Sequence, residues 1–194
     1  NHGQIYSGRA LEFDGVTDYL TAADTDALDV TSITAVAWIY VDNFTGENVI
    51  IAKGYNTAWE FATDNSTGKL KVNAHVDGTY YASDTAGNTS DTALELSTWY
   101  RVVWTHDKST RISKLYINGV LDGTTTYTAG DGSGLGTNST AVSVGVRISG
   151  TYGLFPGKMS NVQLWDTAWS ADDALYDYNN PEQLALNRGG TSLT

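Results

Sequence analysis

The alternation of side chains along several segments is the feature that most constrains the fold of this chain. Between Ile33 and Val41 the sequence reads ITAVAWIYV, and both sets of alternate positions are largely apolar. Between Lys69 and Val76 it reads KLKVNAHV, with an apolar residue at every second position and Lys, Asn or His between them. Because successive side chains of a strand point to opposite faces, the first segment predicts a central strand and the second a half-buried strand.

Further strand patterns are separated by short turn sequences. The other predicted strands lie at 49–53, 58–63, 99–107, 114–119, 141–146 and 158–167, and the predicted turns lie at 64–68, 77–78, 107–111 and 118–119. Asn118-Gly119 is the strongest of the hairpin signals. About a dozen strands at this spacing predict two packed antiparallel sheets. A capping-box pattern, Ser170 followed by Asp173, predicts one short helix near the C-terminus.

Composition limits the domain count and the partners. With 194 residues, 41% of them hydrophobic, the chain can bury one substantial core, and we expect a single domain over 1–194. It has no cysteine, which excludes disulfides and thiolate zinc sites. The net charge of −11 disfavours nucleic acid. There is no apolar run of about 18 residues, so we expect no membrane insertion, and the chain is either soluble or part of a larger one.

Four blocks of the sequence, taken in order, carry a resemblance to a known family. They are ALEFDGVTDYLTA (10–22), DALDVTSITAVAWIYV (26–41), STWYRVVWTHDKSTRISKLYINGVLDG (97–123) and GKMSNVQLWDTAWSADDALYDY (157–178). Together they resemble the laminin-G-like and concanavalin-A-like lectin/glucanase superfamily, in its bacterial and viral laminin-G-like branch. The resemblance implies an all-β fold, a two-sheet antiparallel jelly-roll β-sandwich with one short C-terminal helix.

Glucanases of this superfamily carry alternating carboxylates, Glu-x-Asp-x-(x)-Glu, because a retaining mechanism needs two carboxylates about 5 Å apart on one face. The stretch LEFDGVTDYL meets only part of this pattern. Glu12 and Asp14 share a strand face, but Gly15 follows at once, so Asp18 lies beyond a turn. We therefore expect no catalytic residues and no enzymatic activity.

The same stretch offers oxygen ligands for calcium. We expect Leu11 and Phe13 to face the core, and Asp14 and Asp18 to lie at the turn as candidate Ca²⁺ ligands. Other acidic positions suited to calcium are Asp24, Asp26, Asp29 and Asp131. The alternative for Asp14 and Asp18 is that they only make Asx-type hydrogen bonds within the turn.

Aromatic residues near loops, with polar neighbours, are the candidates for ligand binding, because flat rings stack on sugars while polar groups bind hydroxyls. The candidates are Tyr55, Trp59, Tyr80, Tyr81, Asp131, Asn138 and Tyr152. We interpret the chain as a non-catalytic, lectin-like carbohydrate-binding module of a larger secreted, cell-surface or virion protein, with calcium as a candidate cofactor. The alternatives are a peptide- or protein-binding adhesin module and a glycan-active hydrolase.

Overall fold

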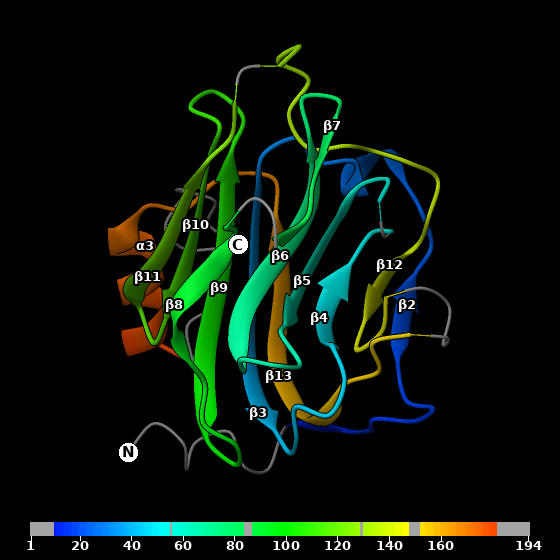
Figure 1. Ribbon diagram of the computed structural model, residues 1–194, viewed down its shortest axis with the longest axis vertical. Coiled ribbons are helices and arrows are strands. Elements are labelled where there is room, and N and C mark those ends of the chain that lie inside the picture. The colour runs from blue at the N-terminus through cyan, green and yellow to red at the C-terminus, as the bar shows by residue number, and fades with distance from the viewer. Residues whose placement is uncertain (1–9, 55, 84–86, 129, 148–151, 182–194) are drawn as a thin grey trace, which may run out of the picture.

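Two antiparallel sheets packed face to face form the body of the molecule (Figure 1). The structure is a computed structural model that describes residues 10–54, 56–83, 87–128, 130–147 and 152–181. Sheet A has the order β1 (Leu11–Asp14), β13 (Pro156–Trp165), β3 (Ile33–Val41), β9 (Trp99–Asp107), β10 (Ile112–Ile117) and β11 (Val120–Thr126). Sheet B has the order β2 (Leu20–Ala22), β12 (Val142–Val144), β4 (Asn48–Ala52), β5 (Trp59–Thr63), β6 (Lys69–Val76) and β7 (Thr79–Tyr81).

The strand order confirms the predicted jelly-roll sandwich. In sheet A, β3 pairs with β13 on one side and β9 on the other, so segments far apart in the sequence lie side by side. Strand β8 (Thr89–Ala93) pairs with β6 near Lys69 and Lys71, beyond the part of β6 that pairs with β7. This strand was not predicted, because its sequence, TSDTA, lacks an apolar alternation.

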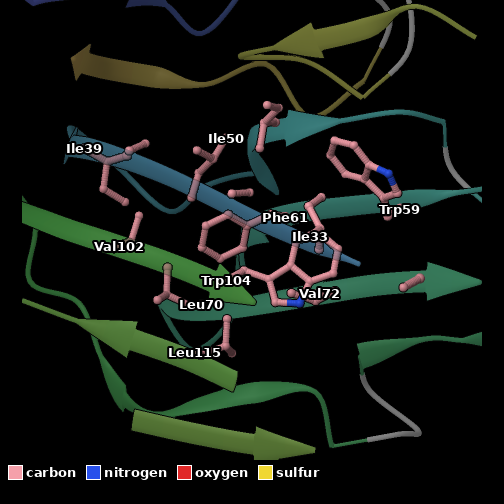
Figure 2. Packing of buried hydrophobic residues seen from close by; sticks show 14 of the residues in the cluster. Ile33, Ile39, Ile50, Trp59, Phe61, Leu70, Val72, Val102, Trp104 and Leu115 are labelled. Atoms are coloured by element: carbon pink, nitrogen blue, oxygen red, sulfur yellow. The ribbon is translucent and has the colours of Figure 1, made fainter. Parts of the chain in front are cut away.

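The space between the sheets is filled by the alternate apolar side chains of both (Figure 2). Ile33 and Trp104 come from sheet A, and Phe61, Leu70 and Val72 come from sheet B. In β3 the outward-facing Val36 is buried as well, because it packs with Val103, Tyr116 and Ala174 on the other side of sheet A. The prediction of a central strand is therefore confirmed.

One α-helix, α3 (Ala171–Asn179), covers this outer side of sheet A. It begins with the predicted capping box between Ser170 and Asp173. A buried ion pair fixes it to β9, since Arg101 Nε lies 2.6 Å and Arg101 Nη2 3.0 Å from the Asp177 carboxylate. A 3₁₀ turn, η1, spans Asp26–Leu28. In the described part of the chain, no helix is both long and apolar enough to cross a membrane.

The opening hairpin corrects one expectation. Phe13 is buried against Phe155, as predicted, but Leu11 is 55% exposed. Within the described part of the chain, strand β1 is the edge of sheet A and pairs with β13 alone, so its end gains no cover on the open side from those residues. The alternation of side chains places Leu11 and Phe13 on the same face of β1, but it does not show that the core covers Phe13 and not Leu11.

A buried histidine lies among the aromatic residues at one end of the core. His106 is fully buried, with its ring 5.5 Å from that of Tyr127 and its Nδ1 3.3 Å from the Ser113 hydroxyl. Its Nε2 has no hydrogen-bond partner among the described residues. Burial lowers the pKa of His106 to about 4, because removing the charged imidazolium from water outweighs the attraction of the Asp107 and Asp77 carboxylates.

We predict that His106 makes the fold sensitive to mild acid. The unfolded chain binds a proton near pH 6.5 and the folded chain only near pH 4, so the stabilisation is complete above pH 6.5 and is lost as the pH falls toward 4. The free energy of unfolding should fall by about 3 kcal/mol across this window. Urea unfolding at several pH values measures it, and His106→Gln should flatten the curve; parallel curves for both proteins would contradict the assignment.

Candidate functional site

The structure separates the aromatic candidates by the face of the sheet on which each lies. Trp59 is only 1% exposed and lies in the core, which corrects the expectation that its ring is available to a ligand (Figure 2). The two neighbouring tyrosines of β7 point to opposite sides. Tyr81 packs inward on Tyr127, with ring centroids 4.7 Å apart, whereas Tyr80 pairs with His75 on the outer face of sheet B. Tyr55 lies outside the described residues.

The two polar candidates act within their own loops. Asn138 donates to the Lys53 carbonyl and to the Thr57 hydroxyl, and it accepts from the backbone N–H of Thr140. Asp131 accepts the backbone N–H of Ser133 at 2.9 Å. These contacts place both side chains in loop-closing roles and leave their predicted ligand contacts without support from the geometry.

The Asp14–Asp18 turn is closed by its own hydrogen bonds. Asp14 Oδ1 accepts from the backbone N–H groups of Val16, Thr17 and Asp18 at 2.7–3.0 Å, and Oδ2 accepts the Thr17 hydroxyl at 2.7 Å. Asp18 accepts the Asp14 N–H in return. Donors from Thr17 and Val16 hold the pKa of Asp14 well below its usual range. These contacts are the Asx-type hydrogen bonds of the alternative interpretation, and calcium binding by Asp14 and Asp18 stays a prediction.

A buried lysine, Lys53, lies beside Asp24 and Asp29, two of the other acidic residues that the sequence suggested for calcium. The Lys53 ammonium is fully buried, pairs with Asp24, and lies 3.2 Å from Asp29 and 3.3 Å from the Thr140 carbonyl. Carboxylates and a carbonyl are the ligands that calcium prefers, and here an internal cation already occupies them. Within the ranges that the structure describes, no three Asp, Glu or His side chains gather in a way that could hold a metal.

The outer face of sheet B carries a set of buried charges. Glu60 of β5 and Asn73 of β6 are register partners, and the Asn73 amide donates to Glu60 Oε1 at 2.9 Å. Glu60 has no exposed surface, although it faces away from the core between Trp59 and Phe61. Lys71, two residues before Asn73 on β6, shares this face. The half-buried strand predicted for β6 is confirmed: its apolar side is buried, whereas Lys69, Lys71 and His75 on its polar side are partly buried and only Asn73 is covered.

Arg147 connects these charges. It follows β12, and its guanidinium pairs with Glu60 through Nε and through Nη2, the latter at 3.0 Å, and with Glu47 through Nη2. Glu47 in turn lies 2.5 Å from the Lys71 ammonium. Burial raises the pKa of Glu60, because desolvation outweighs its contact with Arg147. The guanidinium is therefore held in one position by two carboxylates from separate segments.

Tyr152 lies on this guanidinium. The Arg147 carbon Cζ is 4.4 Å from the centroid of the Tyr152 ring, and 53% of Tyr152 is exposed. The backbone fixes the same segment at two points, since Arg147 N–H donates to the Tyr152 carbonyl and Val49 N–H donates to the Gly153 carbonyl, both at 2.9 Å. Gly153 has φ +70°, and a Cβ there would lie 2.6 Å from Val49, so this close approach requires glycine.

We call Tyr152, Arg147, Glu47 and Glu60 the Tyr152 platform. It combines an exposed ring, supported on one side by a cation, with polar groups fixed below it. Such a surface can stack on the flat apolar face of a sugar or on another planar group. Of the predicted ligand residues, Tyr152 and Tyr80 are the two that the described structure places on this outer face.

Sequence reasoning found Tyr152 but not the charges beneath it. Two signals were present. Glu60 is a lone carboxylate within the apolar strand WEFAT, and Lys71, Asn73 and His75 alternate along β6. Neither signal identified Glu47 or Arg147 as their partners, because the contacts with Arg147 join residues 87 and 100 positions apart in the chain.

Comparison with known proteins agrees with the resemblance of the four sequence blocks. The sequence profile of the concanavalin A-like lectin/glucanases superfamily matches residues 14–174. No curated protein matches the chain in sequence.

Solved structures share the fold at low identity. A carbohydrate-binding protein of Bacteroides ovatus, described as putative, is 22% identical with a TM-score of 0.63; the match covers 84% of this chain and 44% of that one. The CBM40 of a Ruminococcus gnavus sialidase, bound to α2,3-sialyllactose, is 18% identical with a TM-score of 0.62, over 86% of this chain and 96% of that one. Domain 4 of a Geobacillus stearothermophilus arabinanase, in complex with arabinotriose, is 13% identical with a TM-score of 0.64, over 86% and 75%.

We predict that Lys53 stabilises the fold as an internal cation. Lys53→Met keeps the length of the side chain but leaves Asp24 and Asp29 facing each other and the Thr140 carbonyl without a cation. The free energy of unfolding should fall by about 2 kcal/mol, less than for a fully buried pair because both carboxylates are partly exposed. Denaturant unfolding measures it, with Lys114→Met on β10, where the lysine is only partly buried, as the control. Equal midpoints for the two variants would show that the cation is dispensable.

Proposed function

Because this chain belongs to the concanavalin A-like lectin/glucanases superfamily, we propose that it is a non-catalytic carbohydrate-binding module with its site at the Tyr152 platform. The observation that carries the proposal is the exposed Tyr152 ring lying on a guanidinium that two carboxylates hold in place. A ring fixed before the ligand arrives loses little conformational entropy on binding.

Sugars suit this surface because their apolar C–H faces stack on rings while their hydroxyls bind polar groups. One side of the Tyr152 ring lies against Arg147. Since 53% of the residue is exposed, we assign the exposed surface to the opposite side of the ring. His75 and Tyr80, further along the outer face of sheet B, extend it with a second ring pair whose centroids are 5.4 Å apart. The sialidase and arabinanase domains with this fold, each solved with an oligosaccharide, support the choice of ligand class.

The positions of the carboxylates favour sugar binding without hydrolysis. A glycosidase needs two carboxylates that reach the substrate. Glu47 and Glu60 are both buried, and both are paired with Arg147, so neither offers a free oxygen pair to a sugar. Glu12 and Asp14 lie on β1 at the edge of sheet A, away from the platform.

We further propose that the module belongs to a larger secreted, cell-surface or virion protein. The chain spans 44% of the Bacteroides ovatus protein that it resembles, which supports a modular arrangement. In such a protein the module would hold its parent on a glycan surface.

The first prediction from this proposal concerns Tyr152. Tyr152→Ala removes the stacking ring and should weaken binding to glycans by at least about tenfold, whereas Tyr152→Phe keeps the ring and should retain most of the affinity. A glycan array identifies the ligand, and calorimetry with that ligand measures the dissociation constants.

Leu121→Ala is the control, because Leu121 is 47% exposed but lies on β11, at the edge of sheet A. It should bind as the parent does. Unchanged binding by Tyr152→Ala would exclude the platform as the site. Binding to a peptide panel, with no glycan bound, would favour the adhesin alternative.

Calcium assistance is a separate proposal and is tested without a ligand. If the native state binds Ca²⁺, millimolar Ca²⁺ should raise the thermal unfolding midpoint and EDTA should reverse the shift. The expected site is on the acidic loops, so Asp18→Asn should reduce the shift and Asp91→Asn on β8 should not. Identical midpoints in Ca²⁺ and EDTA would remove calcium from the proposal.

A further inference from the structure

We infer that the Tyr152 platform selects uncharged glycans against acidic ones; this inference rests on the proposed function and adds the class of ligand. The families of sugar that such folds bind differ in charge, as the sialyllactose and arabinotriose complexes illustrate. The charges around the platform decide between them.

An acidic sugar needs a cation that is not already paired. The Arg147 guanidinium gives Nε to Glu60, and it gives Nη2 to both Glu60 and Glu47. Glu47 and Glu60 are both buried. A sugar carboxylate that paired with Arg147 would displace one of them from the guanidinium and leave a buried carboxylate unpaired, which is unfavourable. Arg147 therefore supports the ring rather than binding an anion.

The second cation near the platform is committed in the same way. The Lys71 ammonium lies 2.5 Å from Glu47 and 3.7 Å from Asp64. Among the residues that the structure describes, the connected set contains two cations, Lys71 and Arg147, against three carboxylates, Glu47, Glu60 and Asp64, which gives a formal charge of −1.

The surroundings add to this imbalance. Glu60 is fully buried, so its carboxylate already lacks solvation, and bringing a further anion close to it is unfavourable. The whole chain carries a formal charge of −11, so long-range attraction also favours ligands that are not acidic. The features left for recognition are stacking on the Tyr152 ring and hydrogen bonds to sugar hydroxyls, and an uncharged sugar can bind through these two kinds of contact alone.

Matched pairs of oligosaccharides that differ by an acidic group test this inference. Lactose against α2,3-sialyllactose, and a galactan oligomer against an oligogalacturonide, should be measured by calorimetry at low ionic strength. The neutral member of a pair that binds should bind at least about tenfold more tightly, and added salt should narrow the difference because it screens the repulsion.

A charge variant makes the cause visible. Asp64→Asn removes one carboxylate from the connected charge set without changing a residue of the platform, and it should raise affinity for the acidic member several-fold while leaving the neutral member within about twofold. Glu12→Gln removes one charge from β1 of sheet A and should change neither. Glu47→Gln removes a carboxylate of the platform itself and should raise affinity for the acidic member at least as much; its unfolding midpoint is measured beside it, because Glu47 is buried and pairs with both Lys71 and Arg147.

The outcomes separate the two proposals. Acidic members that bind as tightly as the neutral ones, through a site that Tyr152→Ala abolishes, would overturn the charge selection and leave the carbohydrate-binding function intact. Binding that does not depend on Tyr152, or the absence of binding to any glycan, would overturn the proposed function and the selection together.

Discussion

The packing of Trp104 against Trp59 and Phe61 is the contact on which the rest of this molecule depends. Trp104 comes from sheet A and the other two from β5 of sheet B, with ring centroids 5.8 and 6.2 Å apart, and all three are buried (Figure 2). This contact joins the two sheets and determines which side chains of β5 point into the core. Because side chains alternate along a strand, burying Trp59 and Phe61 inward places Glu60 on the outer face.

The position of Glu60 then dictates what surrounds it. A carboxylate with no exposed surface is costly unless it is paired, and Arg147, together with Asn73, supplies the partners. The same guanidinium supports Tyr152 at the surface, so a constraint that begins in the core ends at the proposed binding ring. Covered charges of this kind contribute little net stability, and we interpret them as the means by which the outer face of sheet B keeps one geometry.

Sequence reasoning was strongest where a local pattern decides the structure. The alternation in β3 and β6, the Asn118-Gly119 turn and the Ser170–Asp173 capping box are each properties of a few neighbouring residues, and all are present as predicted. It was weakest for Trp59. The predicted strand at 58–63 contains Trp59 and is present as β5, but the neighbouring sequence GYNTA made the Trp59 ring a ligand candidate, and the structure buries it. Burial depends on what packs above a residue, which spacing does not show.

The sequence by itself determined the class of fold and most of the strands and turns, and it indicated that Tyr152 lies in a loop, because hydrophobic periodicity and turn chemistry are local. Only the tertiary structure decided which polar groups meet. It brought Glu47, Glu60, Lys71 and Arg147 together from four segments, and it placed Lys53 between two aspartates that the sequence offered to calcium. Ion pairs between residues tens of positions apart depend on strand order and register, and these are set when the two sheets pack.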